Sequence, residues 1–158
     1  MRKNDINGRI GSIIHIGKPF ESHDGVSLSN RFMCIFSIEY DYLILMPMST
    51  FHSKDAKLKK LRISTNFEYS KIHGNIRDGY IKCNQIYALS EEDFSNFNEI
   101  KLSIQMNKKH FEKLQNHVRN LQKDNKVKFF KKIIIFDDES KLIKKEQINE
   151  TEIDDYER

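Results

Sequence analysis

The stretch RFMCIFSIEYDYLILMPMST, residues 31–50, decides the fold of this chain. It holds two apolar runs, Arg31–Ile38 and Asp41–Met48, which are separated only by Glu39 and Tyr40. Two apolar runs joined by so short a connection predict an antiparallel β-hairpin. We therefore expect a β-sheet that is built around this hairpin.

An earlier strand is predicted upstream of the hairpin. The β-branched run RIGSIIHI, residues 9–16, follows the turn signal Asn7-Gly8 and has the composition of a strand. Residues 17–30 contain a proline and several turn formers, which predict a long polar loop. Because long loops in compact domains are often functional, this loop is a candidate part of a site.

Three later segments also have the composition of strands. In LRISTNF, residues 61–67, apolar and polar side chains alternate, which is typical of a strand with one face in water. The run IKCNQIYAL, residues 81–89, follows two turn signals, and VKFFKKIIIF, residues 127–136, is apolar and β-branched. Each predicts one further strand.

Two helices are expected near the end of the chain. Ser90 followed by an acid three residues later resembles a capping box and predicts a short helix. From Asn107 to Gln122 apolar residues recur at intervals of three and four, which predicts an amphipathic helix capped by Asn107. Short strands with few intervening helices imply a mainly β fold, a small antiparallel barrel with a C-terminal helix packed on it.

Length and composition limit the classes of protein. With 158 residues, the chain is expected to form one domain over residues 1–136, followed by a flexible acidic tail over residues 137–158. Cys34 and Cys83 lie in apolar runs without metal-ligand spacing, which argues against a disulfide scaffold and a zinc site and favours the reducing cytoplasm. The longest apolar run, Tyr42–Met48, is far too short to cross a membrane, and the first residues, MRKNDINGR, do not have the apolar stretch of a signal peptide, so we expect neither a membrane nor a secreted protein.

Charge divides the chain into two unequal parts. Residues 137–158 contain nine acids and four bases, a net charge of −5, whereas residues 1–136 contain 23 bases and 14 acids, a net charge of +9. A basic body suits binding to phosphates. The same composition also arises from a biased genome. The tail is interpreted first as a solvated charged terminus, with a segment that covers the basic groove as the alternative.

Polar residues at predicted strand ends and in loops supply the candidate site. Phosphate-binding loops, dinucleotide fingerprints and zinc-protease motifs are absent from the sequence. Taken singly, each candidate also has an ordinary structural explanation, such as a turn cap, a surface ion pair or a solvated imidazole. The candidates are His23, Asp24, Arg31, Ser49, Thr50, Lys82, Asn84 and Gln85.

Taken in order, these segments resemble the PemK/MazF family of toxin endoribonucleases over roughly residues 8–123. The resemblance rests on the first strand, the loop with Glu21, His23 and Asp24, the strand opened by Arg31, the motif LMPMST and the segment GYIKCNQIYALS, residues 79–90, followed by a helix. Phe32 stands where the family usually has proline, and the order of Ser49 and Thr50 is swapped.

The resemblance implies an SH3-like barrel that works as a homodimer, binds single-stranded RNA and is restrained by an antitoxin. It further implies metal-independent and cofactor-independent cleavage, in which the ribose 2′-OH attacks phosphorus to leave a 2′,3′-cyclic phosphate. Arg31 would stabilise the charge on the phosphorane, with Ser49 and Thr50 as hydrogen-bond donors. The expected RNA contacts are Lys82, Asn84, Gln85 and Asp24.

The resemblance leaves the proton-transfer groups less well defined. Some relatives carry an Asp where this chain has Asn84, whose amide cannot transfer a proton near neutral pH. His23 beside Asp24 is the expected acid or base, and His52 is a second candidate. A non-catalytic module that binds nucleic acid or protein on the same barrel is therefore the alternative, as is an interaction protein whose basic body contacts its own acidic tail.

Overall fold

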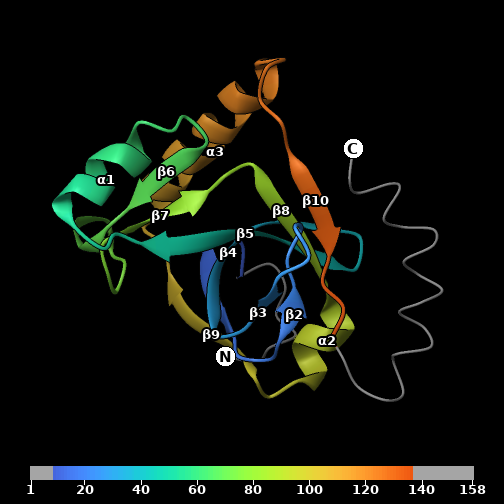
Figure 1. Ribbon diagram of the computed structural model, residues 1–158. Coiled ribbons are helices and arrows are strands. Elements are labelled where there is room, and N and C mark those ends of the chain that lie inside the picture. The colour runs from blue at the N-terminus through green and yellow to red at the C-terminus, as the bar shows by residue number, and fades with distance from the viewer. Residues whose placement is uncertain (1–8, 137–158) are drawn as a thin grey trace.

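The computed structural model describes residues 9–136, and its elements are shown in Figure 1. Both the Asn7-Gly8 turn and the acidic tail predicted from the sequence lie outside the described residues. Most of the described elements are strands, which confirms the mainly β prediction. The elements are β1 (Ser12–Ile16), β2 (Phe20–Glu21), β3 (Ser27–Leu28), β4 (Arg31–Glu39), β5 (Tyr42–Thr50), α1 (Lys54–Leu61), β6 (Asn66–Tyr69), the 3-10 turn η1 (Lys71–His73), β7 (Gly79–Lys82), β8 (Gln85–Ser90), α2 (Glu91–Asn96), β9 (Ile100–Gln105), α3 (Lys108–Lys123) and β10 (Phe130–Ile133).

The predicted hairpin is confirmed as β4 and β5. The two strands pair antiparallel from Met33 opposite Pro47 to Glu39 opposite Tyr42. Tyr40, in the connecting turn, adopts a left-handed φ of 56° and has a fully exposed side chain. The second strand runs two residues further than expected, to Thr50.

The main sheet has the strand order β10-β8-β5-β4-β1-β9. Its ladders are antiparallel apart from β10, which pairs parallel to β8. The expected first strand is confirmed from Ser12 onward, and the strand expected in residues 127–136 is confirmed as the shorter β10. Within residues 9–136, β10 and β9 are edges that do not pair with each other, so the ladders do not close into a ring.

Strand β5 divides one of its edges between two partners. Its first half, Tyr42 to Leu45, pairs with β8, and its last three residues pair with β7, which in turn pairs with β6. Leu45 lies opposite Tyr87, and Met48 lies opposite Ile81. A step of three residues along β5 thus corresponds to a step of six residues along the segment that contains β7 and β8. The strand predicted over residues 81–89 is therefore interrupted, and its extra residues form the turn at Cys83 and Asn84.

Two predictions between residues 17 and 67 were wrong. The strand expected over residues 61–67 begins only at Asn66, because Lys54–Leu61 forms helix α1, whose first turn is capped by the Ser53 hydroxyl accepting from the Ala56 amide at 3.0 Å. No residue of α1 is buried, so no apolar periodicity marks it in the sequence. The loop over residues 17–30 contains the small hairpin β2–β3.

The two predicted helices are confirmed as α2 and α3. Ser90 caps α2 by accepting from the Asp93 amide at 3.1 Å, and Asn107 caps α3 by accepting from the Lys109 amide at 3.0 Å. The strand between them, β9, was not predicted. Its apolar residues Ile100, Leu102 and Ile104 alternate with polar ones, so the period-2 signal of a strand was present in the sequence and was missed.

The two faces of the sheet pack into separate apolar clusters. On β1, Ile14 and Ile16 lie in one cluster and Ile13 lies in the other, as expected from the alternation of side chains along a strand. The first cluster includes residues of α2, β2 and the segment around β10, and α3 contributes Leu114 and Val118 to the second. Figure 1 shows α3 beside β6 and β7, with α2 at the opposite end of the sheet. None of the helices within residues 9–136 has the length and apolarity needed to span a membrane.

Helix α3 contacts β6 and η1 through a buried histidine. His110 is 8% exposed, and its Nε2 donates to the Glu68 carbonyl oxygen at 2.9 Å. Its ring stacks on that of His73, with centroids 3.9 Å apart. Burial lowers the pKa of His110, the positive charges of His73 and Lys113 lower it further, and interactions with Glu68 oppose the shift.

We expect the folded state to lose stability at mildly acidic pH because of His110. Since its folded-state pKa is below the ordinary value of about 6.5, its contribution is complete above that pH and is lost as the pH falls through the lowered pKa. His110→Gln, which keeps an N–H donor, should therefore lose less stability than the wild type between pH 7.5 and pH 5. Urea denaturation of both proteins measures this, with the exposed His52→Gln as control; equal losses in wild type and His110→Gln would contradict the assignment.

Candidate anion-binding groove

A groove with a cavity volume of about 360 Å³ lies where the start of β4 meets the end of β5. It brings together three of the predicted site residues, Arg31, Ser49 and Thr50. His52, the second candidate for proton transfer, also lines it. We call this the cationic groove; its lining residues are Asn30, Arg31, Phe32, Met48, Ser49, Thr50, Phe51, His52, Ala56, Lys60, Arg77 and Tyr80.

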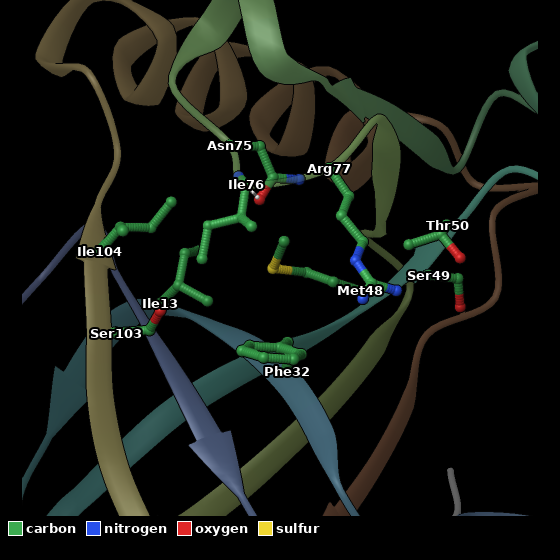
Figure 2. A pocket seen from close by; sticks show the side chains of 10 residues that line it. All are labelled: Ile13, Phe32, Met48, Ser49, Thr50, Asn75, Ile76, Arg77, Ser103 and Ile104. Carbon is green, nitrogen blue, oxygen red and sulfur yellow. Dashed lines mark hydrogen bonds between the residues drawn. The ribbon is translucent and has the colours of Figure 1, made fainter.

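The backbone of three strands places the groove residues. Arg31 opens β4 beside Ile16 of β1, while Ser49 and Thr50 close β5 opposite Tyr80 and Gly79 of β7. The loop that leads into β7 carries Arg77, and Figure 2 shows the Arg77 side chain extending from that loop toward Ser49. Phe51 stacks on Tyr80 with ring centroids 5.2 Å apart and so forms a packed wall of the groove.

Unpaired positive charge collects at the groove. Arg31, Lys60 and Arg77 line it, and no Asp or Glu is among its described lining residues. Within residues 9–136, none of these three cations forms an ion pair, and neither does the nearby Lys82. Cations held close together without counter-charges repel one another, and a bound anion would relieve this repulsion.

The pKa of Lys82 is lowered by its surroundings. Burial is the largest cause, followed by the positive charges of Arg31 and Lys60, while the Asp24 carboxylate acts in the opposite direction. Lys82 therefore lies within the electrostatic reach of the groove, although it does not line it. A phosphate bound at Arg31 and Lys60 would offset the repulsion that Lys82 experiences.

An apolar pocket of about 230 Å³ continues from the groove (Figure 2). We call it the apolar pocket. The two cavities share Phe32, Met48, Ser49, Thr50 and Arg77. The pocket is completed by Ile13, Asn75, Ile76, Ser103 and Ile104.

His23 and Asp24 lie outside both cavities. The backbone amide of His23 donates to the Tyr87 hydroxyl oxygen at 3.1 Å, its Nδ1 lies 3.3 Å from the same oxygen, and its ring packs against Phe130. The Asp24 carboxylate accepts a hydrogen bond from the Ser22 hydroxyl, which is the main reason that the pKa of Asp24 is lowered. His23 is thus held in place by residues of β8 and β10 and does not line the groove.

Asn84 and Gln85 hold β10 against the sheet. The Asn84 side-chain amide donates to the Lys128 carbonyl oxygen at 3.2 Å, and the Asn84 carbonyl oxygen accepts from the Phe130 amide at 2.8 Å. Gln85 pairs with Phe130 in the parallel ladder. Asn84 and Gln85 therefore contribute to the packing of β10 on the sheet, a role that was not predicted from the sequence.

The sequence patterns did not reveal two cations of the groove. Lys60 lies on α1, a helix that the sequence did not predict, and Arg77 lies in the loop before β7, between the turn signals at residues 73–75 and 78–79. Only the folding of β7 against β5 brings Arg77 to Ser49. The basic composition of LKK at residues 58–60 is the one local signal that was present.

Comparison of the chain with family models, with curated proteins and with solved structures finds no match. Among the described residues, no three His, Cys, Asp or Glu side chains are grouped so that they could hold a metal ion.

We expect Gly79 to be required for the shape of the groove. A Cβ at Gly79 would collide with the carbonyl oxygen of Ser49, a backbone atom that cannot move aside alone. Gly79→Ala should therefore lower the free energy of unfolding by about 1–3 kcal/mol, as measured by urea denaturation. At Gly17 a Cβ would lie 3.2 Å from the Glu99 carbonyl oxygen, which a small shift relieves, so Gly17→Ala should cost less. A Gly79→Ala protein as stable as the wild type would show that β5 and β7 are further apart than described.

Proposed function

We propose that this chain is the toxin of a toxin-antitoxin pair, a metal-independent endoribonuclease that cleaves single-stranded RNA. The proposal includes a curled, SH3-like arrangement of the sheet and a resemblance to PemK/MazF toxins. One observation carries it: Arg31, Ser49 and Thr50, chosen from the sequence for phosphate chemistry, line one groove with two further unpaired cations.

The groove has the groups that stabilisation of a phosphorane needs. As the ribose 2′-OH attacks phosphorus, negative charge gathers on the non-bridging oxygens. A guanidinium is always ionised and matches two such oxygens, so Arg31 binds the phosphate, with Arg77 as a second cation. The hydroxyls of Ser49 and Thr50 donate hydrogen bonds to the same oxygens.

Proton transfer in this proposal falls to an imidazole. An imidazole can accept the proton of the 2′-OH and can also return a proton to the leaving 5′-oxygen. His52 is the one histidine among the described residues that line the groove, whereas the Nδ1 of His23 lies near the Tyr87 hydroxyl, outside the groove. His52 is therefore the first residue to test, and His23 the second.

The proposed partners follow from the same reading. The RNA substrate would bind along the basic body, and a cognate antitoxin would restrain the toxin by occupying the cationic groove. A homodimer in the cytoplasm is the expected assembly.

A non-catalytic RNA-binding module is the second candidate function. It is favoured by the lack of a carboxylate among the described residues of the groove. It is also favoured by Asn84, which stands where some relatives of the resembled family have an Asp and whose side chain hydrogen-bonds to the Lys128 carbonyl oxygen. Such a module would bind RNA with the salt dependence of a phosphate-contacting protein and leave it intact.

We expect the purified chain to cleave a long single-stranded RNA in EDTA and to leave fragments that end in 2′,3′-cyclic phosphate. Arg31→Ala should reduce the rate about a hundredfold or more, because it removes the main stabilising group for the phosphorane. The measurement is the initial rate from gel-resolved fragments, with end-group analysis of the products.

Arg119→Ala is the matched control, since Arg119 is an exposed arginine on α3 whose guanidinium bonds Asn116 outside the groove. Its rate should equal that of the wild type. Cleavage by Arg31→Ala at the wild-type rate would rule out the proposed site. Intact RNA with folded wild-type protein would favour the binding module if the RNA is still bound.

A further inference from the structure

The apolar pocket has the features of a site for a flat, hydrophobic group. Phe32 lines the pocket and is 42% exposed, so its ring is accessible to a ligand. Its ring packs against the His15 imidazole, with centroids 4.8 Å apart, which fixes its orientation. Met48 and Ile76 form further walls, as Figure 2 shows.

The loop that carries Ile76 is held in place before any ligand binds. The Asn75 side chain donates to the Tyr69 carbonyl oxygen at 2.7 Å and accepts from the Ile76 amide at 2.8 Å. The first bond ties the loop to the end of β6, and the second lies within the loop, between neighbouring residues. The pocket is therefore preformed, which lowers the entropic cost of binding.

The position of the pocket indicates what occupies it. It opens directly into the cationic groove, and Arg77 lines both cavities. A ligand that fills both must carry negative charge beside a flat apolar group. A nucleotide of a single strand combines a phosphate with a base whose faces stack on aromatic side chains.

We propose that the apolar pocket is a subsite for one nucleobase of a single-stranded nucleic acid, with Phe32 as its stacking platform. This inference rests on the proposed function, because it assumes that the adjoining phosphate lies in the cationic groove. Ser103, at the rim of the pocket, offers a hydroxyl that can hydrogen-bond to the edge of the base.

A binding experiment with uncleavable probes tests the subsite. The two probes are a fluorescein-labelled 2′-O-methyl RNA nonamer of mixed sequence and a fully abasic nonamer with the same number of phosphates. Fluorescence anisotropy with the full chain gives both affinities. We expect the wild type to bind the base-bearing probe at least about tenfold more tightly than the abasic probe.

Phe32→Ala should weaken binding of the base-bearing probe about tenfold or more and remove most of the preference, with a smaller effect on the abasic probe, because Phe32 also lines the cationic groove. Tyr40→Ala is the control, because Tyr40 is an exposed aromatic residue at the turn between β4 and β5 that lines neither cavity. It should behave as the wild type, and circular dichroism confirms that both variants are folded.

The possible failures are distinguishable. If the wild type binds both probes equally well, the base subsite is wrong while phosphate binding by the groove stands. If Phe32→Ala weakens both probes to the same extent, Phe32 does not act through a base, and the subsite is again wrong. If neither probe binds, the proposed function fails together with the subsite.

Discussion

The structure depends on the way in which β5 shares one edge between two strands. One edge of a strand can hydrogen-bond to two successive partner strands only if the register of each partner matches the N–H and C=O groups along that edge. Here β8 pairs with the first half and β7 with the last three residues, and the step between the two ladders leaves Met46 and Pro47 unpaired on that side. Proline cannot donate to a ladder, so Pro47 stands where a missing amide costs least. This step turns the end of β5 away from β8 and toward the loop that carries Arg77.

The groove is a consequence of that step. Arg31 and Ser49 lie on neighbouring strands of the hairpin, and β7 adds Tyr80 from the other side of β5. The positive charges around them have no carboxylate partners among the described residues, so the folded state holds repulsion that a phosphate would relieve. This repulsion destabilises the free protein more than the complex with an anion, and the difference favours binding of an anionic ligand.

The sequence predicted the parts of this fold that local chemistry determines. The hairpin, the first strand and the caps of α2 and α3 followed from apolar spacing and from Ser90 and Asn107. Helix α1 did not, because all of its residues are at least partly exposed and none marks a buried face. The candidate site divided in the same way. Arg31, Ser49 and Thr50, chosen because they flank strands, line one groove, whereas Arg77 reaches the groove only through a tertiary pairing. His23 does not line the groove, because its contacts are with Tyr87 and Phe130.

The parallel strand β10 also affects how the chain reaches this structure. It joins residues near the end of the described chain to Gln85–Ala88, and the segment after it supplies Ile134 and Phe136 to the first apolar cluster. Contacts so distant in sequence form late, because the intervening chain must first be ordered. During synthesis, β8 therefore leaves the ribosome well before its neighbour exists. Until β10 arrives, an apolar strand edge is open to other chains, and this interval is the time at which the protein is most exposed to aggregation.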